Sequence, residues 1–412
     1  MTMTEAELAR YAEAVIDDCL GTQPGDLVAV HGEPAHAPLA RALVDAAYRA
    51  GARYVDLVYV DPAAKRSRIQ HADAETLGGL PAWHEQRMKG LLAADASIVS
   101  ITGESTPGLL GGLDPARASL ERTSRLPGQR VYLRAIELGR ARFCVVAWPV
   151  PGWAGPAYPE LDPDAATEHV AADLLEFCRL APDDPPDAWA RHLAGLTARA
   201  DALTELGLDR IEMRGAGTSL DLGLSPGTRW VAARERDHTD RMFCANLPTE
   251  EVFTSPDAGR VDGTFACTRP LGLDGRRITG IRGEFRRGKL VSIDADAPED
   301  RAFLWSYFQR DRGASRLGEL ALVDATSRIG QKGRTYGLTL LDENAVSHIA
   351  LGSGFAGARL PDPSQRGARG VNRSAIHVDV MIGAPEQDVT GVRADGSRVA
   401  LISGGTWQRL PL

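Results

Sequence analysis

Residues 25–33 read Gly-Asp-Leu-Val-Ala-Val-His-Gly-Glu, and this stretch decides the fold of the first third of the chain. Its apolar run at 27–30 follows a Gly-Asp pair and predicts a strand that is buried on both faces. Ahead of this strand, apolar residues recur every three or four positions over 4–20 and predict an amphipathic helix. Helical and strand-like segments then alternate, with further strands expected at 54–60, 96–101 and 143–150. This alternation predicts a doubly wound, mostly parallel α/β sheet.

The turn after the first strand argues against one common ligand of such sheets. It reads His31-Gly32-Glu33-Pro34 and lacks the glycine-rich loop that approaches a pyrophosphate. We therefore expect no dinucleotide in this domain.

A change in composition separates two predicted domains. Residues 181–187 read Ala-Pro-Asp-Asp-Pro-Pro-Asp, which cannot continue a helix or a strand. We place the boundary near residue 185, with an α/β domain at 1–185 and a second domain at 186–412. After a connecting helix at 188–206, short β runs punctuated by glycine predict a strand-rich α+β domain.

Composition and charge narrow the class of protein. The chain has 412 residues, of which 43% are apolar and 25% charged, as in an ordinary globular protein. Its net charge of −8 comes from mixed signs without a basic stripe, so we expect no nucleic acid partner. We find no membrane span and no secretory leader, and predict a cytoplasmic location. The five cysteines show no CxxC or paired spacing, which predicts reduced thiols and neither disulfides nor a thiolate zinc site.

The first candidate site lies at residues 375–383, which read Ala-Ile-His-Val-Asp-Val-Met-Ile-Gly. The alternation is that of a strand, so His377 and Asp379 project from one face about 7 Å apart along the backbone. Two ligands could then share one metal ion. A His-Asp hydrogen-bonded pair on a solvent-facing strand would give the same pattern, so this motif alone decides nothing.

Three more candidates lie beside apolar runs. His348 follows acidic residues and precedes a glycine-rich turn, which fits a ligand-binding turn or a helix end with a capped histidine. Glu251 and Glu319 each adjoin an apolar run, where a glutamate without a partner is rare. Each could also be a solvated glutamate at a strand end.

Taken together, four segments closely resemble the M29 family of metallo-aminopeptidases, the aminopeptidase T and aminopeptidase II type. They occur in the family's order between residues 246 and 383, and the first 185 residues resemble the family more loosely. The segments are NLPTEEVFTSP at 246–256, LGELALVD at 317–324, LDENAVSHIALGSGF at 341–355 and NRSAIHVDVMIG at 372–383.

The resemblance implies a thermophilic metalloprotease-like fold, a homodimer, a peptide substrate and two divalent metal ions per chain, zinc, cobalt, manganese or magnesium. Glu250 stands where the family often has glycine, so its neighbour is the implied ligand. Glu319 is implied to be the general base as well as a ligand. The implied metal ligands are Glu251, Glu319, His348, His377 and Asp379.

One residue departs from the family pattern. Phe355 stands where the family commonly has a tyrosine whose hydroxyl is thought to stabilise the tetrahedral intermediate. Arg373 and Ser374 are possible replacement donors, although a salt bridge or a turn contact explains each of them better.

Two alternatives remain open. Proteins that resemble this family open dihydroxypyridine rings with one Fe(II) held by two histidines and an aspartate, which here would be His348, His377 and Asp379. Such a site does not need Glu251 and Glu319, whose presence favours two metals and hydrolysis. A non-catalytic family member would fit Phe355 but would leave the full ligand set unexplained.

Overall fold

The computed structural model describes residues 2–274, 276–355 and 371–410. The chain divides into two compact units. The first contains residues 1–189 and 234–248, and the second contains residues 190–233 and 249–412. The first unit therefore includes 234–248, which the sequence analysis assigned to the second domain. The domain boundary near residue 185 stays a prediction.

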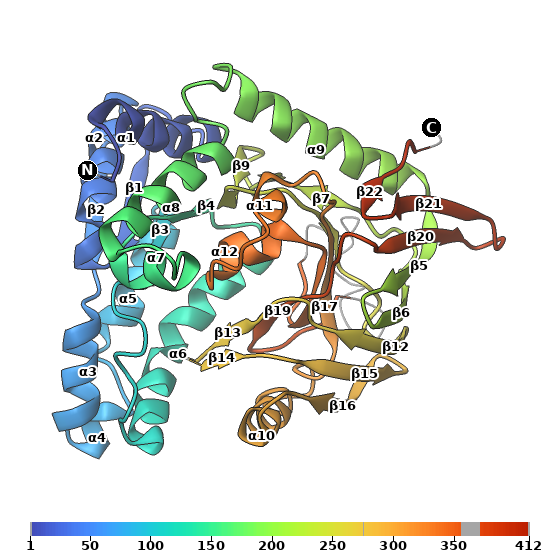
Figure 1. Cartoon of the computed structure of the whole chain (residues 1–412). Helices are drawn as coiled ribbons and strands as arrows, with labels where there is room; N and C mark the ends of the chain where they lie inside the picture. Colours follow the sequence, from blue (N-terminus) through green and yellow to red (C-terminus); the bar gives the residue numbers. More distant parts are fainter. Residues whose placement is uncertain (1, 275, 356–370, 411–412) are drawn as a thin grey trace. The chain divides into compact units, whose positions relative to one another are not determined.

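The first unit is built on a parallel five-stranded sheet in the order β10-β4-β3-β1-β2 (Figure 1). From β1 the chain adds β2 on one side and returns to add β3 on the other, so the sheet is doubly wound as predicted. The strands are β1 Leu27–Gly32, β2 Tyr54–Tyr59, β3 Ser97–Thr102, β4 Phe143–Ala147 and β10 Asn246–Leu247.

Helices accompany this sheet, and α2 packs against both β1 and β2. The predicted N-terminal helix forms, capped by Thr4, but its second half is a π-helix, and Gly21 with a φ of +57° ends it. The helical segments are α1 Glu5–Glu13, η1 Ala14–Cys19, η2 Pro34–His36, α2 Ala37–Arg49, α3 Pro62–His71, α4 Ala74–Leu77, α5 Trp83–Ala93, α6 Pro115–Glu137, α7 Pro151–Ala157 and α8 Pro163–Phe177.

Two details of this unit differ from the sequence predictions. β4 ends at Ala147 and not at residue 150, because Pro151 starts α7 directly afterwards. The two-residue strand β10 was missed, since so short a run has no periodicity. The hairpin of β8 Arg234–Arg236 and β9 Met242–Cys244 precedes β10 and belongs to the same unit.

The second unit is rich in strands, as predicted, and α9 Ala188–Glu205 leads into it. Its strands pair in antiparallel fashion. Its five-stranded sheet, in the order β19-β18-β17-β11-β7, carries the candidate site. These strands are β7 Val231–Ala232, β11 Val252–Thr254, β17 Leu317–Leu322, β18 His348–Gly352 and β19 His377–Met381.

An eight-stranded antiparallel sheet and a two-stranded ribbon complete the strands of this unit. The larger sheet contains β5 Leu208–Gly215, β6 Thr218–Gly223, β12 Val261–Ala266, β15 Arg282–Arg286, β16 Lys289–Asp294, β20 Asp388–Arg393, β21 Arg398–Ser403 and β22 Thr406–Trp407. The ribbon pairs β13 Leu271–Leu273 with β14 Arg276–Ile278. The helices are α10 Pro298–Tyr307, α11 Arg328–Gln331, α12 Thr339–Asp342 and η3 Glu343–Ala345.

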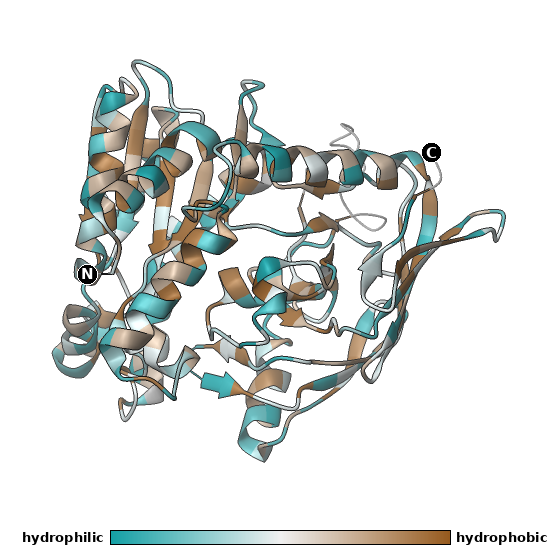
Figure 2. Ribbon diagram, turned by 45° about the horizontal axis from the view of Figure 1, so that its top comes forward, coloured by the Kyte–Doolittle hydropathy of each residue, from teal (hydrophilic) through white to brown (hydrophobic). Residues whose placement is uncertain are grey.

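The central strands of the two five-stranded sheets are buried on both faces. In the first unit Val28, Ala29 and Val30 of β1 are all buried, as expected of a parallel strand covered on both faces. In the second unit every residue of β17 and β18 is buried, including Glu319 and His348. Figure 2 shows many of the strands in the brown of hydrophobic residues. Among the described residues, no helix is long and apolar enough to cross a membrane.

Candidate metal centre

The register of the five-stranded sheet places the predicted ligands on one face. Residues directly opposite each other in antiparallel strands project to the same side of a sheet. Asp379 pairs with Ala350, which pairs with Glu319, so the aspartate and the glutamate flank an alanine. In the neighbouring rows of this face, His377 pairs with Gly352, and His348 pairs with Ala321, which pairs with Phe253.

Small residues leave room for this convergence. Ala321, Ala350 and Gly352 occupy the positions between the larger side chains of the face. A β-bulge between Leu317 and Glu319 keeps Glu319 in register with the other ligands. The bulge requires glycine at Gly318, where a Cβ atom would lie 2.2 Å from the carbonyl oxygen of Ser353.

The first group of donors is fully buried. One ligand atom each from Glu251, Glu319 and His348 lies within 4.8 Å of the other two. His348 Nε2 lies 3.3 Å from Glu251 Oε2, an atom that makes no hydrogen bond of good geometry despite its burial. A buried carboxylate oxygen of this kind is expected where a cation binds.

The second group shares Glu319 with the first. Ligand atoms of Glu319, His377 and Asp379 also lie within 4.8 Å of one another. His377 Nε2 is 3.1 Å from Glu319 Oε2 and 3.2 Å from Asp379 Oδ1. The sequence prediction that His377 and Asp379 project together from one strand is therefore confirmed.

Both histidines are prepared to act as ligands. His377 Nδ1 lies 2.6 Å from the carbonyl oxygen of Ser353, and His348 Nδ1 lies 3.4 Å from that of Val346. A carbonyl oxygen only accepts, so Nδ1 carries the proton in each ring. The lone pair of a neutral ring is then on Nε2, which faces the carboxylates. Metal-ligating histidines commonly show this arrangement.

The carboxylates of this centre are destabilised by burial and by each other. Burial raises the pKa of Glu319, and the carboxylates of Glu251 and Asp379 raise it further against the lowering effect of His377. For Asp379, burial raises the pKa, but His377 and His348 lower it below its usual value.

The imidazoles respond in the opposite sense. Burial lowers the pKa of His348, but Glu251, Asp379 and Glu319 outweigh that effect and raise it to about 10. They do so because a cluster of buried carboxylates strongly favours any positive charge among them. The site therefore has the electrostatic character of a cation-binding site.

Sequence reasoning missed one further carboxylate, Glu343. It is 9% exposed, and its pKa is raised well above the usual value by burial and by Asp379 and Glu251. Asp342 beside it is structural: it accepts hydrogen bonds from the backbone amides of Tyr336 and Gly337 and pairs with Arg269. The signal was the acidic pair before His348, but the sequence does not show which member faces the site.

One of the two predicted replacement donors, Ser374, has a structural role. The Ser374 hydroxyl donates to Asp311, whose carboxylate also accepts from the amide of Ala375, so this serine forms a turn contact. The role of Arg373 stays a prediction.

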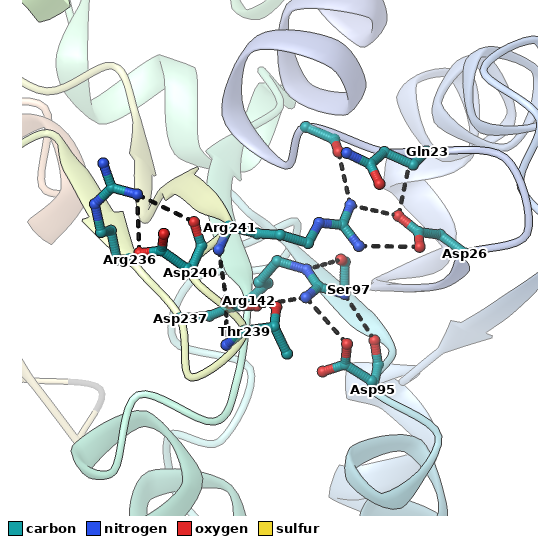
Figure 3. A network of polar contacts seen from close by, with 11 residues as sticks. Gln23, Asp26, Asp95, Ser97, Arg142, Arg236, Asp237, Thr239, Asp240 and Arg241 are labelled. Atoms are coloured by element: carbon teal, nitrogen blue, oxygen red, sulfur yellow. Dashed lines mark hydrogen bonds and ion pairs between the residues drawn. The ribbon is translucent and has the colours of Figure 1, made fainter.

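A second cluster of potential metal ligands proves to be structural. Asp95, Asp237 and His238 also bring ligand atoms within 4.8 Å of one another. The guanidinium of Arg142, however, forms ion pairs with both aspartates (Figure 3). Because a cation of the chain itself lies between these carboxylates, the group has no need of a metal ion.

The buried cluster of carboxylates and Nε2-directed imidazoles on one sheet face is typical of a metalloenzyme. The chain belongs to the M29 family of thermophilic metalloproteases, whose model matches residues 4–407. The predicted resemblance is confirmed, and with it the prediction of a metallopeptidase.

Known relatives and a solved structure match this chain over nearly its whole length. Aminopeptidase PepS of Streptococcus thermophilus is 33% identical over 410 residues, covering 97% of each chain. Aminopeptidase T of Thermus thermophilus is 33% identical over 409 residues, covering 99% of this chain and 100% of that one. The solved structure of wild-type AmpT from Thermus thermophilus superposes with a TM-score of 0.90 at 32% identity, covering 98% of this chain and 99% of that one.

A more distant likeness concerns the fold alone. The structure of 2,5-dihydroxypyridine dioxygenase from Pseudomonas putida matches with a TM-score of 0.55 and 14% identity, over 98% of both chains. At this identity the likeness carries no information about the reaction.

Proposed function

We propose that the chain is an aminopeptidase that hydrolyses the N-terminal peptide bond of peptides at a centre of two divalent metal ions. The observation that carries this proposal is the position of Glu319, which belongs to both donor groups of the buried cluster. A carboxylate shared by two groups is suited to bridge two ions. Glu251 and His348 would complete one site, and His377 and Asp379 the other.

The charge of the cluster supports two ions. Glu251, Glu319 and Asp379 contribute the carboxylates of the two overlapping donor groups, and together they carry a formal charge of −3 when ionised. Two divalent cations with a bound hydroxide ion would balance this charge and leave both imidazoles neutral, the form in which Nε2 is a ligand. With one divalent ion the remaining negative charge would favour protonation of the imidazoles, in line with the raised pKa of His348, and a protonated imidazole cannot be a ligand.

The protein residues have separable tasks in this proposal. When bound, two divalent ions lower the pKa of a water molecule and polarise a carbonyl group. Glu319 belongs to both donor groups, a position from which its carboxylate could hold a proton and return it to the leaving amine. The backbone carbonyl of Ser353 keeps His377 in the ligand tautomer throughout.

The mononuclear alternative is less well supported. His348, His377 and Asp379 would have to surround one Fe(II) ion, yet among the described residues these three do not form a group of their own. Each histidine instead belongs to a different group with Glu319. The proposal keeps the cytoplasmic homodimer that the family resemblance implies, and sedimentation velocity tests the dimer.

Peptide hydrolysis after metal stripping tests the proposal. Protein freed of metal by a chelator would be incubated with Co²⁺, Zn²⁺, Mn²⁺ or Mg²⁺ and a panel of short peptides, with and without N-terminal acetylation. We expect metal-restored release of the first residue from free peptides only. Equal cleavage of acetylated peptides would exclude an aminopeptidase, and ring cleavage of a dihydroxypyridine restored by Fe²⁺ alone would favour the dioxygenase.

A further inference from the structure

Phe355 contacts one of the proposed ligands directly. Its ring centroid lies 5.1 Å from that of His377, with the planes at 65°, an edge-to-face contact. The side chain is only partly buried, so burial of the ring in a core does not explain its position.

The Phe355 ring is itself held from two directions. Phe253, on the ligand-bearing face of the sheet, packs against it at 5.2 Å and 62°. The backbone amide of Phe355 donates a hydrogen bond to Ser255 Oγ at 2.9 Å, which restrains the backbone of Phe355. The preceding residue, Gly354, packs closely against the neighbouring backbone, since a Cβ atom there would lie 2.6 Å from the carbonyl oxygen of Gly318.

These contacts complete the restraint of His377. The hydrogen bond from Nδ1 to Ser353 restrains the His377 ring at one atom. The edge-to-face contact with Phe355 restrains the orientation of the ring plane. With both restraints, Nε2 stays directed at Glu319 and Asp379, at 3.1 and 3.2 Å.

We propose that Phe355 is a positioning residue for the metal site of His377 and Asp379, and that it acts through its aromatic ring. The proposal rests on the proposed two-metal function and deepens it. It assigns this position a role that needs no hydroxyl group. The role concerns one of the two ions more than the other because, among the described ring contacts, Phe355 meets His377 and not His348.

Two dissociation constants for Co²⁺, measured by chelator competition on the metal-free full chain, test this inference. In Phe355→Ala we expect one of the two constants to rise about 10- to 100-fold, the range typical of residues that orient a metal ligand, and the other to change less than about twofold. Phe355→Tyr, which keeps an aromatic ring at this position, should keep both dissociation constants within about threefold of the wild-type values.

A matched control separates positioning from general packing. Phe303 is another partly buried aromatic residue of the same unit, in a tilted contact with Tyr307 at a centroid distance of 5.6 Å. Phe303→Ala should leave both constants unchanged. The inference is overturned if Phe355→Ala changes neither constant, or changes both equally together with the melting temperature. Wild-type protein that binds fewer than two ions would overturn the proposed function and this inference with it.

Discussion

Two clusters of carboxylates, one in each unit, are balanced electrically in different ways. In the first unit, Asp237 pairs with Arg142, and both side chains are 1% exposed. Arg142 also donates to Ser97 and Asp95, while Arg241 pairs with Asp26 (Figure 3). In this network each acid has a guanidinium partner within the chain.

In the described part of the second unit, Glu251, Glu319 and Asp379 form no ion pair with an arginine or a lysine. Glu251, Glu319 and Asp379 meet only the imidazoles of His348 and His377. An arginine is always charged and balances a carboxylate permanently, whereas an imidazole balances one only while it is protonated and then cannot be a metal ligand. The difference indicates that one cluster is a structural connection and that the other needs cations from solution.

The largest effect is expected from Glu319→Gln. The amide cannot accept a proton and is a poor bridge between two cations, so metal-dependent peptide hydrolysis should fall about 10²- to 10⁴-fold. Steady-state rates on a short peptide at saturating Co²⁺ measure this loss. Glu284→Gln, which only breaks a pair with Arg286, should keep wild-type activity. Equal rates for the Glu319 variant and wild type would contradict the shared role of Glu319.

The converse test is Arg142→Met in the first unit. It leaves Asp95 and Asp237 without their guanidinium, and breaking a buried pair in this way costs about 3–5 kcal/mol of the free energy of unfolding. Urea unfolding measures the change. Arg236→Met, at an exposed pair with Asp240 in the same network, should cost less than about 1 kcal/mol. If a divalent metal ion restored the stability of the Arg142 variant, the first cluster would also be a metal site, and the contrast between the two clusters would be wrong.

Metal removal should affect the second cluster alone. At a free metal concentration one hundred times the dissociation constant, binding stabilises the folded chain by about 2.7 kcal/mol per site, and a chelator abolishes this. The melting temperature with and without chelator measures the effect. The same decrease is expected in Arg142→Met, since the two clusters are independent. No decrease in wild type would mean that the acid-rich cluster is stable without cations.

The smallest effect concerns acid stability of the first cluster in chelator-treated protein. Burial raises the pKa of Asp237, but hydrogen bonds from Thr239, Arg241 and Arg142 lower it to about 2 from an ordinary 3.8. A depressed carboxyl pKa stabilises the folded state above the ordinary pKa, and this contribution is lost as the pH falls from about 4 to about 2. Urea midpoints across this range should fall more steeply for wild type than for Asp237→Asn. Parallel curves would show that Asp237 is not stabilised by its partners.

Local patterns allowed much of the candidate site to be predicted. The alternation at 375–383 predicted that His377 and Asp379 share a face, because the two-residue period of a strand is a local property. The register across four strands could not be read from the sequence, so the sharing of Glu319 between two groups emerged only from the structure. Glu343 was missed because its neighbour Asp342 is equally acidic.

The same limit applies to the fold. Strands β1 to β4 can be predicted from their apolar runs. Strand β10 has only two residues, and it joins the sheet by pairing with β4, which lies about one hundred positions earlier in the chain. The pair of Arg142 and Asp237 joins residues 95 positions apart, and no periodicity links them. The predicted boundary near residue 185 could not anticipate that 234–248 returns to the first unit.

The metal content of the chain after equilibrium dialysis tests the central claim most directly. Elemental analysis of wild-type protein dialysed against micromolar Co²⁺ or Zn²⁺ should give two ions per chain, and Glu319→Gln should give fewer. Arg142→Met, provided that it remains folded, should also give two. Wild-type protein that holds one ion or none would contradict the account, since the carboxylates of Glu251, Glu319 and Asp379 would then be balanced without a pair of divalent cations.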